Sequence, residues 1–305
     1  MPEGDTVWRT AARLHEALAG QVLTVADLRW PGVATVELTG ARTLQVRARG
    51  KHLLHRLSSG LTVHSHLRME GQWRIAATAA VSPGRLADPD LRAVLGTDRW
   101  TALGLRLGML DVVATDAEGT LVGHLGPDLL GPDWDPTQAA ARVARSGTDL
   151  GSALLDQRNL AGLGTMYTAE VLFLTGRHPW APAGDVPPDE LVGLLERAHR
   201  LLDVGRRHAV QSTTGDRRRG HTTYVHAKAG MPCRRCGGTV RACPIGPPLR
   251  ERVMFYCPSC QGGLAPGDDG RAQRPTATTP RRPTPPTGAR PGPRAPRWRP
   301  AAPGR

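Results

Sequence analysis

The chain has no long apolar segment. Its 305 residues contain no uninterrupted run of eighteen apolar residues, which argues against a conventional membrane-spanning helix. The first residues also lack the apolar core of a secretory signal peptide. We therefore expect a cytoplasmic protein that has no membrane partner.

Lysine is almost absent. Only Lys51 and Lys228 occur, so nearly all of the 40 basic residues are arginine. Nine arginines and no acidic residue lie after residue 270, and they carry most of the net charge of +13. The rest of the chain is only mildly basic, so a nucleic-acid partner must be argued from particular sites rather than from total charge. Each retained lysine is a candidate for a specific role.

Cysteine is scarce, with five residues in the chain. A cytoplasmic protein uses them as thiols or metal ligands more often than as disulfides. Four of them form two Cys-x-x-Cys pairs, which we expect on facing hairpin turns: Cys233 with Cys236 and Cys257 with Cys260. Four thiolates satisfy the tetrahedral preference of Zn²⁺ and leave no open position. We predict one structural zinc ion rather than redox thiols, with Cys243 as a bystander.

Apolar spacing predicts an α+β multidomain protein. A helix capped by Asp5 and closed by Gly20 precedes short alternating runs at residues 22–25, 43–46, 53–57, 62–67 and 105–107, typical of a β-sandwich. Further helices are expected from Asp135 to Arg145 and over 150–156, 166–174 and 188–204, and then a β-hairpin around the cysteines with cations at its tip. We expect domains at 1–125 and 137–228, a linker at 126–136, a zinc finger at 229–262 and a disordered Pro/Arg-rich tail at 263–305.

The start of the chain suggests covalent chemistry. Loss of Met1 would leave Pro2 with a free secondary amine, and an α-amine is far less protonated at neutral pH than a lysine. Such an amine attacks an aldehyde-level sugar carbon to give an iminium ion. Glu3 is adjacent and could transfer the protons of that step. Many chains begin Met-Pro without catalysis, so this signal needs support from other motifs.

A glycine-rich turn between two expected helices is a second candidate site. Gly162 and Gly164 flank Leu163 just before the helix over 166–174. Exposed amides at a helix N-terminus can bind phosphate. An ordinary packing corner explains the same glycines equally well.

Together, the motifs resemble the formamidopyrimidine-DNA glycosylase/endonuclease VIII family. The matching segments lie in the family's order at residues 1–4, 49–53, 66–71, 155–164 and 252–261. The sequence is most similar to the endonuclease VIII-like enzymes of actinobacteria. The resemblance implies an N-terminal helix and β-sandwich, a helix–two-turn–helix domain and a zinc-finger hairpin. It also implies a monomeric enzyme without a small-molecule cofactor, which removes oxidised bases from damaged DNA and cleaves the strand at the abasic site.

The resemblance also implies residue roles. Pro2 would hold the sugar as an iminium and Glu3 would assist ring opening. Lys51 and Arg252 would contact phosphates, with Lys51 also close to the chemistry. Met69 would fill the gap left by the flipped nucleotide, and a core methionine is its alternative. Gly164 and Thr165 would contact DNA at the glycine turn.

Two positions depart from the family pattern. Thr6 replaces a second glutamate found in many relatives, and Thr165 replaces the usual asparagine. A hydroxyl and a backbone N–H can still bind phosphate, although more weakly. His64 and His66 share one strand face, and without a third ligand we interpret them as structural or DNA-edge residues rather than a metal site.

Three functions remain open. The first is a bifunctional glycosylase/lyase for oxidised pyrimidines, which Gly4 favours because the purine branch typically has leucine there. The second is the same chemistry on oxidised purines. The third is a non-catalytic zinc-ribbon protein that binds DNA.

Overall fold

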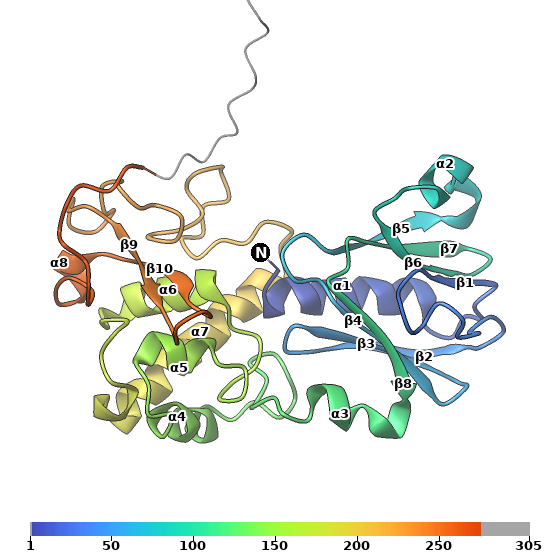
Figure 1. Ribbon diagram of the computed structural model, residues 1–305, viewed down its shortest axis with the longest axis horizontal. Coiled ribbons are helices and arrows are strands. Elements are labelled where there is room, and N and C mark those ends of the chain that lie inside the picture. Colours follow the sequence, from blue (N-terminus) through green and yellow to red (C-terminus); the bar gives the residue numbers. More distant parts are fainter. Residues whose placement is uncertain (1, 276–305) are drawn as a thin grey trace, which may run out of the picture.

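The computed structural model describes residues 2–275, which form a strand-rich half and a mainly helical half (Figure 1). The strands are β1 (Val25–Leu28), β2 (Thr43–Arg49), β3 (His52–Leu57), β4 (Leu61–His66), β5 (Gln72–Ala77), β6 (Leu91–Gly96), β7 (Trp100–Leu105) and β8 (Met109–Ala114). The helices of this half are α1 (Gly4–Leu18), η1 (Thr78–Ala80), α2 (Pro83–Leu86), η2 (Thr115–Ala117) and α3 (Gly119–Val122).

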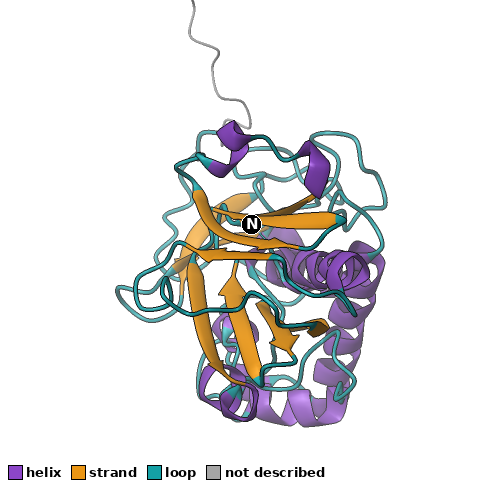
Figure 2. Ribbon diagram, turned by 90° about the vertical axis from the view of Figure 1, so that its right-hand side faces the viewer, coloured by secondary structure: helices purple, strands orange, loops and turns teal. Residues whose placement is uncertain are grey.

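The strands form two antiparallel sheets, in the orders β1-β6-β7-β5 and β2-β3-β4-β8. The sheets face each other and α1 runs along one side of them (Figure 2). Leu14 of α1, Leu53 of β3 and Leu95 of β6 belong to one buried cluster, so helix and sheets share a core. The predicted sandwich is confirmed.

Three local predictions are wrong. The helix begins at Gly4 with Glu3 at the cap position, and Asp5 lies buried inside its first turn. Residues 22–25 are not a strand, since Val22 makes only an isolated bridge and β1 starts at Val25. Residues 105–107 are not one either, because β7 ends at Leu105 and Arg106 has a φ of 48°.

The helical half contains the predicted helices. They are α4 (Pro136–Ala144), α5 (Leu150–Leu155), α6 (Thr165–Thr175), η3 (Ala183–Asp185) and α7 (Pro188–Arg206). Asp135 caps α4 as predicted by accepting from the amides of Thr137 and Gln138. Residues 166–173 of α6 are all buried, which marks α6 as the central helix of this half. Within residues 2–275 no helix has both the length and the apolar character needed to cross a membrane.

The last described elements form the predicted hairpin, with β9 (Arg241–Ile245) antiparallel to β10 (Arg252–Tyr256), followed by α8 (Pro258–Gln261). The prediction that the disordered tail begins at residue 263 is wrong for residues 263–275. Asp268 pairs with Arg241, and the side-chain amide of Gln273 exchanges two hydrogen bonds of 2.8 Å with the backbone of Ala242. This segment therefore packs along the outer edge of β9. The rest of the predicted tail lies outside the described residues.

Candidate functional site

A cavity of about 430 Å³ brings together site residues from distant parts of the chain. It is lined by the N-terminus, the β2–β3 turn, the β4–β5 turn, the α5–α6 turn and the start of β10. The predicted residues that line it are Pro2, Lys51, Met69, Gly164, Thr165 and Arg252. A larger cleft of about 570 Å³, beside α1 and β2, contains none of these residues.

Glu3 lies beside this cavity and is completely buried. Its carboxylate accepts hydrogen bonds from the amides of Gly164 and Met166, both at 2.8 Å, so it caps the N-terminus of α6. Burial raises the pKa of the Glu3 carboxyl. The nearby Lys51 ammonium and the amides of Met166 and Gly164 act against that rise. The carboxylate is thus held in a fixed orientation next to Pro2.

The glycine turn was expected to bind a DNA phosphate through its exposed amides, and for Gly164 this prediction is wrong. Gly164 does not offer a free amide to phosphate, because that amide is already donated to Glu3. A Cβ atom at Gly164 would lie 2.5 Å from Cδ of Glu3, so only glycine permits this approach. The helix terminus therefore binds an anion from the protein itself.

Lys51 lies in a tight turn that is anchored from the other half of the molecule. Gly50 takes a φ of 57° and donates its amide to Oδ2 of buried Asp128 at 2.7 Å. The Lys51 ammonium donates to the carbonyl of Leu163 at 2.5 Å, within the glycine turn. Burial lowers the pKa of Lys51, Glu3 opposes this shift, and Arg252 adds to it. Lys51 is thus a partly desolvated cation directed toward the cavity.

The first turn of α1 is locked against the helical half. The amide of Gly4 donates to the carbonyl of Gly162 at 2.9 Å, and a Cβ at Gly4 would lie 3.0 Å from Cα of Gly162. Buried Asp5 accepts hydrogen bonds from the hydroxyl of Tyr167 and from Gln211, both at 2.8 Å. These contacts fix the direction in which Pro2 enters the cavity. The close approach to Gly162 is enough to explain why residue 4 is a glycine. Gly4 therefore no longer favours oxidised pyrimidines over oxidised purines.

Comparison with known proteins agrees with this geometry. Residues 1–107 match the model of the formamidopyrimidine-DNA glycosylase N-terminal domain, and residues 125–216 match that of its H2TH domain. The chain is 50% identical over 283 residues to "Probable endonuclease 8 2" of Streptomyces coelicolor, covering 92% of this chain and all of that protein. The chain belongs to the formamidopyrimidine-DNA glycosylase/endonuclease VIII family.

Other relatives support the assignment. "DNA-(apurinic or apyrimidinic site) lyase Nei2" of Mycolicibacterium smegmatis is 45% identical, over 86% of this chain and 99% of that one. A structure titled as a complex between the Lactococcus lactis Fpg and DNA containing an abasic site shares the fold. Its TM-score is 0.70 at 23% identity, and the match covers 85% of this chain and 99% of that one. The relatives are named as glycosylases, endonucleases and a lyase, so the chain is a DNA-repair enzyme of this family.

Met69 lies in the turn between β4 and β5 and lines the cavity. It is 64% exposed, which contradicts the alternative of a core methionine. Arg68 before it has a φ of 50°, and Gly71 after it is held by a hydrogen bond to Leu67. A Cβ at Gly71 would lie 2.4 Å from the carbonyl of Leu67, so the turn needs glycine there. The turn presents an apolar side chain at the cavity mouth.

The four predicted cysteines cluster next to the β9–β10 hairpin, whose second strand begins with Arg252. The sulfur atoms of Cys233, Cys236, Cys257 and Cys260 all lie within 4.8 Å of one another. Tetrahedral coordination at a Zn–S distance of about 2.3 Å requires sulfur separations of about 3.8 Å. The measured separations include 3.9 Å for Cys233–Cys260 and 3.5 Å for Cys236–Cys257. The donor set therefore fits a tetrahedral metal ion, and within residues 2–275 no histidine joins such a cluster.

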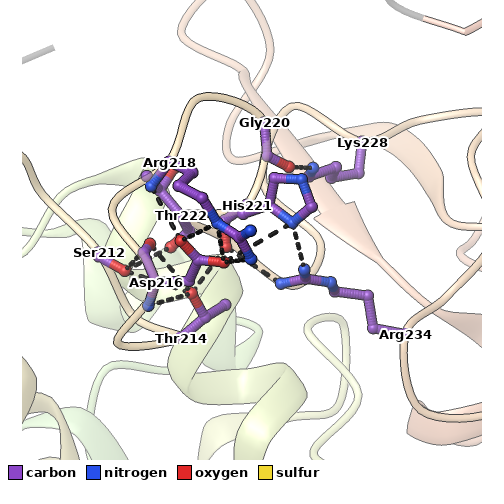
Figure 3. A network of polar contacts seen from close by, with 9 residues as sticks. All are labelled: Ser212, Thr214, Asp216, Arg218, Gly220, His221, Thr222, Lys228 and Arg234. Carbon is purple, nitrogen blue, oxygen red and sulfur yellow. Dashed lines mark hydrogen bonds and ion pairs between the residues drawn. The ribbon is translucent and has the colours of Figure 1, made fainter.

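The loop between α7 and β9, which sequence patterns left undefined, is ordered by polar contacts (Figure 3). Asp216 pairs with Arg218 at 2.7 Å, and Lys228 donates to the carbonyl of Gly220. Buried Glu170 of α6 accepts from the amides at positions 224–226, each at 2.8 Å. Lys228, one of the two lysines, thus stabilises a loop rather than lining the cavity.

Sequence reasoning missed several residues that hold the site. Asp128 anchors the Lys51 turn, and Asp5 and Tyr167 orient the N-terminus. Gln157 accepts from the amide of Gly162 at 3.0 Å and donates to the carbonyl of Leu163 at 2.9 Å. Gln157 lies within the family-like segment at 155–164, so that segment carried a usable signal. Gly50 lies 78 positions from Asp128, and Tyr167 lies 162 positions from Asp5, so no local pattern could reveal these two contacts.

Proposed function

We propose that this protein excises oxidised bases from DNA and then cleaves the strand at the abasic site through a covalent intermediate on Pro2. The observation that carries the proposal is that Pro2, with Glu3 behind it, shares one cavity with two phosphate-binding candidates, Lys51 and Arg252. No ordinary packing requirement explains such a convergence of a chain terminus, a buried carboxylate and a desolvated lysine.

The chemistry begins at the nitrogen of Pro2 once Met1 is removed. A neutral secondary amine attacks C1′ of the sugar, displaces the base and loses its proton, and the nitrogen lone pair then forms the iminium ion as the C1′–O4′ bond breaks. Glu3 is oriented to deliver a proton to the sugar ring and assist its opening. The iminium then acidifies C2′ and permits β-elimination, and a following δ-elimination can release the sugar.

Damaged DNA is the proposed partner of a monomeric enzyme. The target nucleotide must leave the helical stack before C1′ can reach Pro2. Exposed Met69 fills the vacated space, while Lys51 and Arg252 bind phosphates on either side of the flipped nucleotide. Because phosphate contacts carry no sequence information, we expect recognition of damage rather than of sequence.

Oxidised pyrimidines are the proposed lesions. Support comes from the relatives named endonuclease 8 2, at 50% and 42% identity, against 34% for one named formamidopyrimidine-DNA glycosylase, while one named endonuclease 8 1 is 31% identical. Excision rates on matched duplexes containing one oxidised pyrimidine or one oxidised purine test this assignment. A faster rate on the purine duplex would establish the purine alternative.

Covalent trapping separates an enzyme from a non-catalytic DNA-binding protein. Borohydride reduces an iminium to a stable amine, so untagged protein incubated with abasic-site DNA should give a cross-linked band. A non-catalytic binder would shift the DNA in a gel and give no such band. Duplex without an abasic site serves as the control, and a cross-link to it would indicate non-specific reaction.

Thr165→Asn is expected to leave DNA affinity equal or tighter. Thr165 is the first residue of α6 and lines the cavity, so an asparagine amide adds a donor toward phosphate. Equilibrium binding to an uncleavable abasic-site analogue at fixed salt measures the effect. Thr137→Asn, in the exposed first turn of α4, is the matched control. A several-fold loss of affinity for Thr165→Asn alone would refute the phosphate role of this position.

We propose Zn²⁺ as the metal of the four-cysteine cluster, where it would hold the hairpin in shape without taking part in the reaction. Cys257→Ser should lower bound zinc from about one equivalent to near zero and weaken DNA binding, because Arg252 depends on the hairpin. Metal analysis by mass spectrometry and binding assays measure both effects. Cys243→Ser, outside the cluster, should retain zinc. Full zinc content in Cys257→Ser would contradict the assignment.

A further inference from the structure

A row of three hydrogen-bonded side chains leads from the protein surface to the cavity wall. Asp111 of β8 is 41% exposed, and its Oδ2 lies 2.9 Å from Nδ1 of His64, which is 1% exposed. Nε2 of His64 lies 2.8 Å from Nδ1 of His52, and the two rings stack at 5.0 Å. His52 lines the cavity next to Lys51. Neither His52 nor Asp111 has a role in the function proposed above.

The order of partners determines the tautomers along this row. A carboxylate only accepts hydrogen bonds, so a neutral His64 donates from Nδ1 to Asp111 and accepts at Nε2. His52 must then donate from Nδ1, which leaves its Nε2 with a free lone pair. Within the described residues, no hydrogen bond engages that nitrogen. The row therefore holds His52 as a proton acceptor at the cavity wall.

His66, the other histidine that lines the cavity, carries its ring proton on the opposite nitrogen. Nδ1 of His66 accepts the amide of Arg68 at 2.9 Å, so a neutral His66 carries its proton on Nε2. His66 can donate to the cavity but cannot accept a proton there. Of these two imidazoles, only His52 can act as a base.

We propose that His52, positioned by His64 and Asp111, is the base that removes the C2′ proton during strand cleavage. This inference rests on the proposed iminium at Pro2. The row also provides a path for the proton to the protein surface. When His52 accepts a proton at Nε2, it can donate its Nδ1 proton to Nε2 of His64, and His64 can donate its own Nδ1 proton to exposed Asp111.

The step balances in atoms and electrons. The C2′ proton moves to Nε2 of His52, and the C–H electron pair forms the C1′=C2′ bond while the iminium π pair moves to the nitrogen of Pro2. The enamine then returns that pair to re-form the iminium. The C1′=C2′ pair shifts to C2′=C3′, the C3′–O bond breaks, and the phosphate leaves with its electrons.

The surroundings keep His52 in the proton-accepting form before DNA binds. Burial is the main cause that lowers the pKa of His52 to about 3, and His66, His64, His124 and Lys51 add to it. Phosphates that bind beside Lys51 oppose these positive charges and strengthen the base on substrate binding. The base is therefore free of a proton when it is needed and gains proton affinity from the substrate itself.

The test separates iminium formation from elimination on preformed abasic-site DNA in single turnover. His52→Gln should keep the borohydride-trapped yield equal to or above that of the wild type while slowing strand cleavage about 10²-fold. Asp111→Asn should slow cleavage by a smaller factor. His221→Gln, at an exposed histidine of the loop between α7 and β9 that has no contact with the row, is the matched control and should cleave at the wild-type rate.

Chemical rescue distinguishes a base from a structural residue. Added imidazole should restore cleavage to His52→Ala in proportion to its concentration, and it should leave the wild type unaffected. Unchanged cleavage in His52→Gln, loss of trapping together with cleavage, or absence of rescue would each overturn the role of His52. Failure of the wild-type protein to be trapped would instead refute the proposed function.

Discussion

Protein that keeps Met1 in front of Pro2 is expected to lose strand cleavage and borohydride trapping while retaining affinity for abasic-site DNA. The nitrogen of Pro2 is then part of an amide, and its lone pair is delocalised into the carbonyl group. Trapping and cleavage of abasic-site DNA should fall to background. Binding of an uncleavable analogue should stay near the wild-type value, because Lys51, Met69 and Arg252 are unchanged.

The loss of activity can also be measured as a function of the fraction of protein that retains Met1. Expression with the methionine aminopeptidase inhibited yields mixtures whose retained Met1 is measured by intact-mass spectrometry. Active-site titration by trapping should fall in proportion to the retained fraction. Pro2→Gly, which offers a primary amine, should bind normally and trap poorly. Full activity in material that retains Met1 would exclude the nitrogen of Pro2 as the nucleophile.

Gly164→Ala is expected to inactivate the enzyme although it adds only a methyl group. The added Cβ would lie 2.5 Å from Cδ of Glu3, so the carboxylate must leave its place on the amides of α6. Losing a positioned acid–base group costs about 10²–10⁴-fold in rate, and overpacking costs about 1–3 kcal/mol in stability. Single-turnover excision and thermal unfolding measure the two effects separately.

Gly193→Ala is the matched control for this substitution. Gly193 lies on the exposed side of α7, and a Cβ there would meet nothing within 4 Å. An alanine inside a helix should stabilise the protein by roughly 0.5–1 kcal/mol and leave excision unchanged. Near-wild-type excision by Gly164→Ala would show that Glu3 does not need its cap on α6.

The sequence was a good guide where local patterns carry the information. Helix periodicity located α4 to α7, and Asp135-Pro136 marked the start of α4 within one residue. The Cys-x-x-Cys spacing identified the four cysteines that cluster. Motif order recovered the family, and the residues carried over from it share the cavity or lie against it. These signals are local, so folding preserves them.

What the sequence concealed depends on long-range packing. The glycine turn has the chemistry of a phosphate site, yet its amide is occupied by Glu3 from 161 positions away. Asp5 resembles a helix cap but is buried against Tyr167. Residues 263–275 have the composition of a disordered tail, yet the Arg241–Asp268 pair fixes them along β9. Each case turns on a partner that no window of neighbouring residues contains.

The most direct test of the covalent role of Pro2 is peptide mapping of the borohydride-reduced complex by mass spectrometry. Digestion after trapping on abasic-site DNA should place the sugar remnant on the nitrogen of Pro2, in a peptide that lacks Met1. A remnant on the side chain of Lys51, or on a peptide that still begins with Met1, would contradict Pro2 as the nucleophile.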